Sequence, residues 1–389
     1  MSEQKLLCLA MMVKNEAKGI EKTLLSVKDH IDSWLIVDTG SKDDTVAIIE
    51  RVMKGLPGKI VSEPFVDYGT TRNVTLDWAE KDCQCAFVLM LSGNEYVEDV
   101  EKLRAFLESV KDSPSIFHEA FHTNVSLGCT YPSTRITRSG KDWRYTGVVH
   151  EYISKKDSPF LPMLLTPGLI VHEYWNSTLE ESRKKWERDR ELLLRAVKKD
   201  KNDSRSVFYL AQTYRCLGAV PLAKKFYEKR SKMGGWAPEV YEALYNVAEI
   251  TKKEGDYLKA YAQSPYRAEP LVKLAEMTVN TPQISYLYAS RACELAVPGS
   301  TQVVFMDTDA YAFRRWDLLG RSAFYVGEYQ KGIEALEEAL KVRPDAPHLL
   351  ANLEHYRAKL PRFQTAKGLP ISFDALDKDI QKVIQEKTT

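Results

Sequence analysis

Residues 6–16 read LLCLAMMVKNE, an apolar run that stops at three polar residues, Lys14, Asn15 and Glu16. Residues 34–41 repeat this pattern as WLIVDTGS, and residues 86–95 repeat it again as AFVLMLSGNE. Short apolar runs bounded by polar residues and glycine are typical of buried strands. Because ligands of open α/β sheets bind outside the carboxyl ends of the strands, the three polar endings predict where a ligand site lies.

The sequence around these runs predicts a parallel sheet covered by helices. Strands are predicted at 5–13, 34–38, 59–63 and 85–91, and amphipathic helices at 18–28, 43–53, 70–80 and 98–109. This regular alternation of strand and helix is typical of α/β domains. We expect the helix after Asp38 to begin with a capping box formed by Ser41 and Asp44. Residues 115–175 are rich in β-branched and aromatic residues and predict antiparallel strands that complete the domain.

Beyond about residue 176 the sequence predicts helices almost to its end. Apolar and small residues recur there in the phase of tetratricopeptide repeats, most clearly at Leu319, Gly320, Leu336 and Ala339. Prolines between residues 262 and 312 are expected to break helices. Helical hairpins of this kind stack to bury an apolar face that none of them buries alone. We predict domains at 1–176 and 177–360, followed by a tail at 361–389 that could form a short helix.

The composition excludes several classes of protein. A net charge of +1 over 389 residues gives no electrostatic basis for binding nucleic acid or an anionic membrane. The longest apolar stretches fall well short of the roughly 20 residues of a transmembrane helix. Met1 leads directly into the first strand, which predicts no signal peptide. The 6 cysteines show no C-x-x-C spacing, which is typical of a reduced, cytoplasmic protein.

Two of the polar loops have the chemistry of a nucleotide site. Asp38 ends a buried strand and could accept hydrogen bonds from a ribose diol or a base N–H, while Gly40 lets the chain approach a ligand closely. Residues 14–16 follow the neighbouring strand in the same way. The alternative for residues 14–16 is a solvated turn. The alternative for the loop after Asp38 is an ordinary βα turn with a helix cap, and this interpretation is preferred for Asp43 and Asp44, which suit the helix dipole.

A third segment, residues 67–73, reads DYGTTRN and comes directly before a predicted helix. Backbone N–H groups at the start of a helix, together with Arg72 and Asn73, suit a diphosphate or the edge of a base. The alternative is a helix-capping loop with a surface arginine. The residue chemistry alone leaves both interpretations open.

Taken together, these segments resemble the beginning of a family 2 glycosyltransferase with the GT-A fold. The resemblance is carried by residues 10–16 (AMMVKNE), 35–41 (LIVDTGS) and 68–73 (YGTTRN). Residues 143–151 (WRYTGVVHE) also resemble family members that carry C-terminal tetratricopeptide repeats. The resemblance implies a Rossmann-like mixed sheet followed by an all-α repeat domain. It also implies transfer of a sugar, with inversion, from a nucleotide-sugar donor, most often a UDP-sugar.

The chain departs from this family at the end of the fourth strand. Family members usually have Asp-x-Asp there, which holds a divalent cation on the donor diphosphate, whereas residues 92–95 read SGNE. Hard cations prefer anionic oxygen ligands, so we expect Mn²⁺ or Mg²⁺ to bind weakly. The donor could bind with little help from metal, with Lys14, Arg72 and helix N-termini neutralising the diphosphate. Alternatively, a weak cation could be held by Asn94, Glu95 and His172.

A third alternative is that the domain is catalytically degenerate and serves as a binding scaffold. If the domain is active, the resemblance and the strand-end pattern together predict the donor site. Its predicted residues are Lys14, Asn15, Glu16, Asp38, Gly40, Arg72, Asn73, Ser92, Asn94 and Glu95.

The catalytic base is predicted at the end of residues 143–151. An inverting transfer needs a group that takes the proton of the acceptor hydroxyl, and Glu151 is the candidate, with His150 as its neighbour or as a phosphate or metal contact. The alternative is a hydrogen-bonded pair in a strand turn. His172 and Glu173 form a second such pair, which could line the pocket or contact the next domain.

A rival motif, H-E-x-x-H, occurs at residues 118–122 (HEAFH). In zinc peptidases this motif lies on a helix, where both histidines share one face. The surrounding residues here predict a strand, so a zinc hydrolase that uses His118, Glu119 and His122 is a remote alternative.

The repeats suggest partners rather than chemistry. Helical solenoids present concave surfaces to peptides or proteins. In this chain such a surface could hold a glycan or glycoprotein acceptor, bind a protein partner, support self-association or be a purely structural extension.

Overall fold

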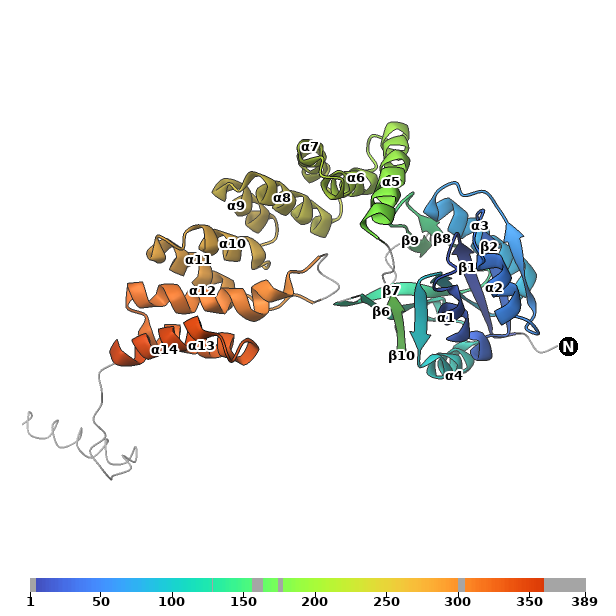
Figure 1. The fold of residues 1–389 in the computed structure, drawn as a ribbon, viewed down its shortest axis with the longest axis horizontal. Coiled ribbons are helices and arrows are strands. Elements are labelled where there is room, and N and C mark those ends of the chain that lie inside the picture. Colours follow the sequence, from blue (N-terminus) through green and yellow to red (C-terminus); the bar gives the residue numbers. More distant parts are fainter. Residues whose placement is uncertain (1–4, 128, 156–163, 174–177, 300–304, 360–389) are drawn as a thin grey trace, which may run out of the picture. The chain divides into compact units, whose positions relative to one another are not determined.

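The computed structural model describes residues 5–127, 129–155, 164–173, 178–299 and 305–359 (Figure 1). Its contacts divide the chain into two compact units, one of residues 1–264 with 299–304 and one of residues 265–298 with 305–389. The division predicted at residue 176 follows the change from strands to helices, which lies inside the first unit, and it stays a prediction. The predicted tail at 361–389 lies outside the described residues.

A mixed sheet forms the centre of the first unit. Its strands lie in the order β3-β2-β1-β4-β7-β6-β10-β5. Their bounds are β1 Leu7–Val13, β2 Ser33–Asp38, β3 Gly58–Ser62, β4 Phe87–Ser92, β5 Glu95–Glu98, β6 Ala120–Leu127, β7 Cys129–Arg138 and β10 Leu164–Glu173. A separate antiparallel pair is formed by β8 Trp143–Thr146 and β9 Tyr152–Lys155.

The pairing of the strands confirms the predicted GT-A-like fold. Strands β3, β2, β1 and β4 are parallel, and β7 runs antiparallel to β4 and to β6. One detail differs from the predicted antiparallel set, because β10 pairs with β6 in parallel and with β5 in antiparallel orientation. Strand β5 was not predicted, since its run of only 4 residues is too short to show a periodicity.

Helices cover both faces of this sheet. Their bounds are α1 Ile20–Leu25, α2 Thr45–Val52, α3 Tyr68–Cys83 and α4 Val100–Val110, with the short turns η1 Lys28–His30 and η2 Ile116–His118. Each helix predicted in residues 5–110 is therefore confirmed. The capping box is wrong, because the residue before α2 is Asp44, without a side-chain cap hydrogen bond. The Ser41 hydroxyl instead accepts a hydrogen bond from the backbone N–H of Asn15.

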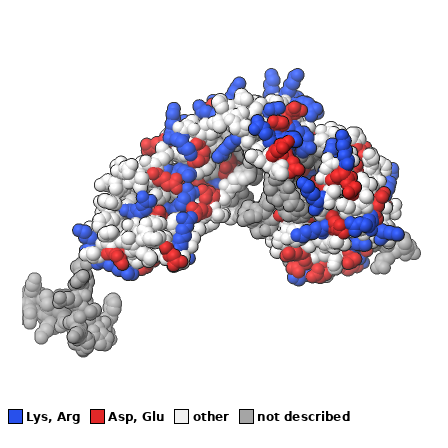
Figure 2. Space-filling view, in the orientation of Figure 1, with Lys and Arg blue, Asp and Glu red and all other residues white. Residues whose placement is uncertain are grey.

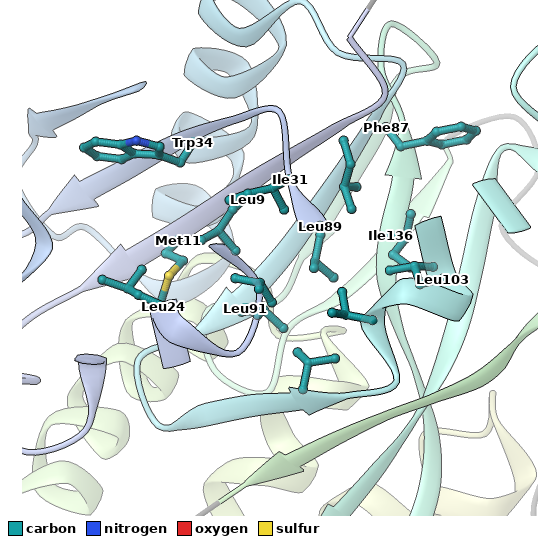
Figure 3. Close-up of a cluster of buried hydrophobic side chains, with 14 of the residues drawn as sticks. Leu9, Met11, Leu24, Ile31, Trp34, Phe87, Leu89, Leu91, Leu103 and Ile136 are labelled. Atoms are coloured by element: carbon teal, nitrogen blue, oxygen red, sulfur yellow. The ribbon is translucent and has the colours of Figure 1, made fainter. Parts of the chain in front are cut away.

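The central strands β1, β2 and β4 are buried on both faces, as expected for a parallel sheet covered by helices, whereas β3 at the edge is more exposed. Along β1, Leu7, Leu9 and Met11 join one apolar cluster, together with residues of α1, α2 and α4 (Figure 3). Cys8 and Ala10, which alternate with them, join a second cluster with residues of α3. The two cores hold the strand ends in place, and the polar loops follow directly from these ends.

The helical region begins within the first unit. Its bounds there are α5 Leu179–Lys199, α6 Ser204–Cys216, α7 Val220–Ser231, α8 Ala237–Thr251 and α9 Glu254–Gln263. Consecutive helices in this series contact one another. Helix α5 starts with a capping box, in which the side chains of Thr178 and Glu181 each accept a hydrogen bond from the other's backbone N–H.

The second unit is also helical and tetratricopeptide-like. Its bounds are α10 Glu269–Met277, α11 Pro282–Glu294, η3 Ala310–Arg314, α12 Arg315–Ser322, η4 Ala323–Val326, α13 Tyr329–Val342 and α14 Pro347–Lys359. A Cβ on Gly320 would lie 2.6 Å from the Leu336 side chain, so the small residue is needed where α12 and α13 pack. Pro270 and Pro282 lie in the first turns of α10 and α11. They start helices rather than break them, because proline fits the first helical turn.

The surface carries charges of both signs. Figure 2 shows Lys and Arg side chains interspersed with Asp and Glu on the visible face, in keeping with the net charge of +1. In the described part of the chain, every helix is too short or too polar to cross a membrane.

Candidate functional site

The three polar strand endings lie side by side at one edge of the sheet. Strand β1 is flanked by β2 and β4, and its register pairs Val13 with Asp38 and Met12 with Ser92. Because these strands are parallel, their carboxyl ends all open toward the loops at residues 14–16, 38–41 and 92–95. The structure therefore brings together the loops that the sequence predicts as one site.

The first loop is tied to the second by hydrogen bonds between backbone N–H groups and side-chain oxygens. The Asn15 N–H donates to the Ser41 hydroxyl at 3.0 Å, and the Asn15 Oδ1 accepts from the Lys42 N–H at 2.8 Å. Asn15 itself has a φ of 55°, a left-handed conformation that is uncommon for residues other than glycine. Its side chain thus shapes the loop rather than pointing freely into the site. Lys14, just before it, is exposed.

Asp38 orders the turn that follows it. Its carboxylate accepts the backbone N–H groups of Gly40 and Ser41, each at 3.1 Å, and Asp38 is buried. Gly40 has a φ of 95°, which a residue with a Cβ would adopt only under strain. These contacts fix the direction of the carboxylate and leave it further lone pairs for a ligand.

Glu16 lies directly against the third loop. A Cβ placed on Gly93 would come within 2.5 Å of the Glu16 Cγ, so this glycine makes room for the glutamate. Burial raises the pKa of Glu16 to about 7, and Asp43 adds to the shift while Lys185 on α5 opposes it. A carboxyl group at this edge of the sheet therefore changes its charge near neutral pH.

Arg72, in the second turn of α3, connects the 92–95 loop to the predicted base. Its Nε donates to Glu151 Oε1 at 2.5 Å, and its Nη2 donates to the Ser92 hydroxyl at 3.1 Å. The side chain is only 9% exposed, and its buried Nη1 has no hydrogen-bond partner among the described residues. Burial lowers the pKa of Arg72, but Glu151, Tyr145 and Glu95 outweigh this and raise it.

The position of Arg72 depends on a close approach at the start of α3. A Cβ on Gly69 would lie 2.4 Å from the backbone oxygen of Gly147, so the helix can approach this loop only with glycine there. Asn73 secures the same contact, since its side chain donates to the Tyr145 carbonyl and accepts the Tyr145 N–H. Asn73 thus joins α3 to β8, whereas the sequence predicts that it contacts the nucleotide-sugar donor.

Glu95 is paired with an arginine that was not among the predicted site residues. Its Oε2 accepts the Ser92 N–H at 2.7 Å, and its Oε1 accepts from Nη2 of Arg135 on β7. Glu95 is 1% exposed. Arg135 Nη2 also lies 3.7 Å from Glu173 Oε1, and its buried Nε has no hydrogen-bond partner in the described residues. No local signal marks Arg135, because its partner is 40 residues away in sequence.

His150 adopts a left-handed conformation, with a φ of 51°, next to the predicted base. Its ring stacks on Tyr209 of α6 at 4.2 Å between ring centroids, and its carbonyl accepts from Arg205 Nη2 at 2.7 Å. Burial lowers the pKa of His150 to about 4, with a further contribution from Lys185. The imidazole is therefore neutral at physiological pH, and its contacts position the adjoining Glu151.

Helices α5 and α6 pack against this region, which the sequence also did not predict. Arg188 donates a hydrogen bond to the hydroxyl of Tyr68, the first residue of α3. Asp189 is 3% exposed, and burial raises its pKa. Val149 packs in one apolar cluster with Leu192 and other residues of α5 and α6. These contacts lie within the first unit.

The residues at 92–95 do not fit a divalent cation. Among the residues that the structure describes, no group of three or more His, Cys, Asp or Glu side chains is arranged to hold a metal ion. Both oxygens of Glu95 already accept hydrogen bonds, and Ser92 and Asn94 offer only neutral oxygens. Asn94 lies in the turn between β4 and β5.

The structure does not bring His172 together with Glu95. His172 pairs with Tyr96 across the strands, stacks on its ring at 4.9 Å and lies 3.1 Å from Glu98 Oε2. Glu173 is instead the residue opposite Glu95. Because neighbouring residues of a strand point to opposite faces, His172 and Glu95 lie on different faces of the sheet.

The H-E-x-x-H motif lacks the geometry of a zinc site. His118 ends the short turn η2, and His122 lies on strand β6. The His118 Nδ1 contacts the Ser113 hydroxyl at 2.7 Å, and the His122 Nδ1 contacts Thr134 at 3.0 Å. Glu119 pairs with Lys155 at 2.9 Å. The motif therefore runs from η2 into strand β6, which lies between β7 and β10, in keeping with the strand that its surroundings predicted.

A cavity of about 640 Å³ lies elsewhere, at the amino end of the sheet beside Leu6. Its charged lining includes Arg104 and Asp32, which pair with each other at 2.9 Å. It contains none of the predicted site residues, and the strands end at the opposite edge.

Comparison with known proteins supports the domain order. The model of "Glycosyl transferase family 2" matches residues 8–117. A TPR repeat-containing protein of Synechococcus elongatus is 25% identical over 260 residues, which cover 64% of this chain and 62% of that protein. An uncharacterized glycosyltransferase of Rickettsia felis is 33% identical over 84 residues, or 22% of this chain and 27% of that protein. The chain thus spans less than two thirds of each of these relatives.

Among solved structures, S. aureus TarS 1-349 in complex with UDP-GlcNAc is similar at a TM-score of 0.32. The two are 14% identical, and the match covers 74% of this chain and 90% of that one.

Proposed function

We propose that this chain transfers a sugar from a nucleotide-diphosphate donor to an acceptor hydroxyl on a glycan or protein, a proposal supported by the match of residues 8–117 to the "Glycosyl transferase family 2" model. The observation that carries the proposal is the convergence of three strand-end loops with the Arg72–Glu151 pair. Polar groups from separate parts of the chain meet there at the edge of the sheet where α/β proteins bind ligands.

The donor is a UDP-sugar in this proposal, as the family resemblance implies. Asp38 accepts hydrogen bonds from the nucleoside, since its turn holds the carboxylate in a fixed direction. Arg72 binds the diphosphate through Nη1, a buried N–H group that otherwise lacks an acceptor in the described structure. Glu16 and Asn94 border the same space from the neighbouring loops, with Glu16 assigned to the nucleotide and Asn94 to the sugar.

The reaction proceeds with inversion at the anomeric carbon. The acceptor oxygen forms a bond to this carbon while the bond from the carbon to the diphosphate oxygen breaks on the opposite side. Glu151 takes the proton of the acceptor hydroxyl. To do so, its Oε1 gives up the hydrogen bond from Arg72 and accepts one from the acceptor hydroxyl instead. The released Arg72 then faces the departing diphosphate, where developing negative charge needs stabilisation.

The helical region has a supporting role in this proposal. Helices α5 and α6 hold the loop of His150 and Glu151 through the Tyr209 stack and the Arg205 hydrogen bond. Binding of a glycan or glycoprotein acceptor, a protein partner or a second copy by the repeats stays a prediction. The cytoplasmic location also stays a prediction.

Release of UDP from a panel of UDP-, GDP- and CMP-sugars tests the proposal, with water and simple glycosides as acceptors. We expect turnover with a UDP-sugar. The turnover rate of Arg72→Gln should be lower by about 100-fold or more, as is found when other hydrogen-bond donors to a developing anion are removed. The matched control is Arg51→Gln, which removes an exposed pair with Glu21 and leaves the rate unchanged. Binding of nucleotide without turnover on any acceptor would instead support the scaffold alternative.

A further inference from the structure

We propose that the guanidinium groups of Arg72 and Arg135 take the electrostatic place of the divalent cation, so that this site binds the donor diphosphate without metal. The inference rests on the proposed function and specifies how the same site recognises its donor. It starts from the mismatch between the SGNE loop at residues 92–95 and a metal site.

The first step concerns Glu95, the single carboxylate of this loop. Its two oxygens accept the Ser92 N–H and the Arg135 Nη2, and the residue is 1% exposed. A cation bound to this carboxylate would have to displace a buried guanidinium and leave it unpaired, which is costly. Glu95 therefore serves as the ion-pair partner of Arg135 and not as a metal ligand.

The second step concerns the free donors of the two arginines. Arg72 Nη1 and Arg135 Nε are buried and have no hydrogen-bond partner among the described residues. A buried N–H group without an acceptor is unfavourable, whereas a phosphate oxygen is an acceptor that guanidinium groups bind especially well. Both arginines contact the 92–95 loop, Arg72 through the Ser92 hydroxyl and Arg135 through Glu95.

The third step is that both arginines act on the same small region. Burial raises the pKa of the Tyr145 hydroxyl, while Arg72 and Arg135 both lower it and Glu151 and Glu95 raise it. Tyr145 is therefore within electrostatic reach of these four charged groups. The Arg72 guanidinium also lies 5.6 Å from the centre of the Tyr145 ring.

The charges of the two arginine–carboxylate pairs match those of a metal site. Two guanidinium groups paired with Glu151 and Glu95 carry the same total charge as one divalent cation between two carboxylates. Glu173, 3.7 Å from Arg135, adds a further negative charge at the side of the pair. The two arginines, each paired with a glutamate, thus correspond to a metal ion held by two carboxylates. They need no ion from solution.

Calorimetric titration of the full-length protein tests the inference in two parts. In the first, Mn²⁺ alone is titrated into the protein, and no saturable binding is expected below millimolar concentration. In the second, UDP is titrated in EDTA and in excess Mn²⁺, and the two dissociation constants are expected to agree within threefold. UDP binding that is tenfold or more tighter with Mn²⁺ would overturn the inference and leave the proposed function standing.

A series of variants tests whether Arg135 supports UDP binding in the absence of metal. Arg135→Gln is expected to weaken UDP binding tenfold or more in EDTA, and Mn²⁺ is expected not to restore it. Arg135→Lys keeps the charge, so its UDP affinity should lie between those of the wild type and Arg135→Gln. Arg51→Gln is the matched surface control. An Arg135→Gln protein with the wild-type unfolding midpoint and unchanged UDP affinity would contradict the inference.

A gain-of-metal variant does not depend on Arg135→Gln folding well. Ser92→Asp combined with Asn94→Asp restores two carboxylates to the loop and is expected to make UDP binding respond to Mn²⁺ by tenfold or more. Wild-type and double-variant proteins with the same strong response would show that the wild-type loop already holds the cation. If UDP binds to none of these proteins in either buffer, both the proposed function and this inference fail.

Discussion

At the scale of single residues, Asp38 does two jobs at the end of β2. Its carboxylate holds the N–H groups of Gly40 and Ser41 and, in our proposal, also faces the nucleoside. Ser92 has a smaller part, because its hydroxyl accepts one hydrogen bond from Arg72. The two residues end strands β2 and β4 but differ in how much of the site depends on them.

This difference gives the first prediction. Asp38→Ala should abolish UDP binding, since it removes the nucleoside contact and the support of the turn. Ser92→Ala removes one hydrogen bond that is worth about 1 kcal/mol, so its affinity should fall by roughly fivefold or less. Isothermal titration with UDP measures both. Equal affinities for the two variants would contradict our assignment of the site.

Glu16 supplies a prediction about pH. In the folded state burial raises its pKa to about 7, above the ordinary value of 4.5, so the folded protein binds this proton more tightly than the unfolded chain does. The contribution of Glu16 to stability is therefore highest below pH 4.5 and falls as the pH rises toward 7.

Glu16→Gln should remove the loss of stability that Glu16 causes as the pH rises. Its free energy of unfolding relative to wild type should rise between pH 5 and pH 8 by about 1 to 3 kcal/mol, the upper figure being the full shift without screening by solvent. Urea unfolding at the two pH values measures the change. Glu180→Gln, an exposed carboxylate on α5, is the control and should show no such gain with pH. A Glu16→Gln protein that follows the wild-type profile would rule out the buried, titrating carboxyl group.

At the scale of elements, the start of α3 positions the chemistry. Gly69 lets the helix approach the Gly147 carbonyl, and Arg72 comes one turn later. The contact relies on a few backbone atoms, so it is sensitive to one methyl group.

Gly69→Ala should therefore destabilise the protein by about 1–3 kcal/mol, because its Cβ would overlap with backbone that has no room to move. UDP affinity should fall as well, since Arg72 moves with the helix. Gly255→Ala in α9 is the matched control, because nothing lies within 4 Å of its Cβ. That change should stabilise the protein by about 0.5 kcal/mol. Urea unfolding compares the two, and equal effects would contradict the close approach.

The elements themselves were largely predictable from sequence, because their signal is local. Strands β1 to β4 and helices α1 to α4 follow from the spacing of apolar residues, with bounds that differ by a few residues. The capping of α2 was wrong because Ser41 serves a long-range contact to Asn15. A capping pattern in sequence does not show which competing partner lies nearby in the fold.

The candidate site was predictable only in part, for the same physical reason. Residues at strand ends, such as Asp38 and Glu16, are marked by their place after an apolar run. Arg135 and Tyr209 carry no such mark, since they reach the site by strand pairing and helix packing over long stretches of sequence. The partners of Glu95 and His150 therefore needed the structure.

At the scale of the whole molecule, the first unit joins the sheet to the beginning of the helical array. Val149 packs with Leu192 and Leu193 of α5 and with Phe208 of α6. The division predicted at residue 176 would cut between the site loops and these supporting helices.

A fragment of residues 1–176 should consequently be less stable than a fragment of residues 1–264. The shorter fragment exposes Val149 and the faces of Tyr68 and His150 that α5 and α6 cover. Each buried apolar side chain of this size contributes about 1.5–3 kcal/mol. We expect a lower unfolding midpoint by circular dichroism and at least tenfold weaker UDP binding. Two fragments with equal midpoints and affinities would show that the sheet domain is independent of the helices.

The most direct test of the central claim is photo-crosslinking of the full-length protein with a 5-azido-UDP-sugar, followed by peptide mapping. The account predicts that the label is found in the tryptic peptide of residues 29–42, which contains Asp38, and that excess UDP prevents the labelling. Labelling confined to α10–α14, or labelling that UDP does not reduce, would contradict a donor site at the carboxyl ends of β1, β2 and β4.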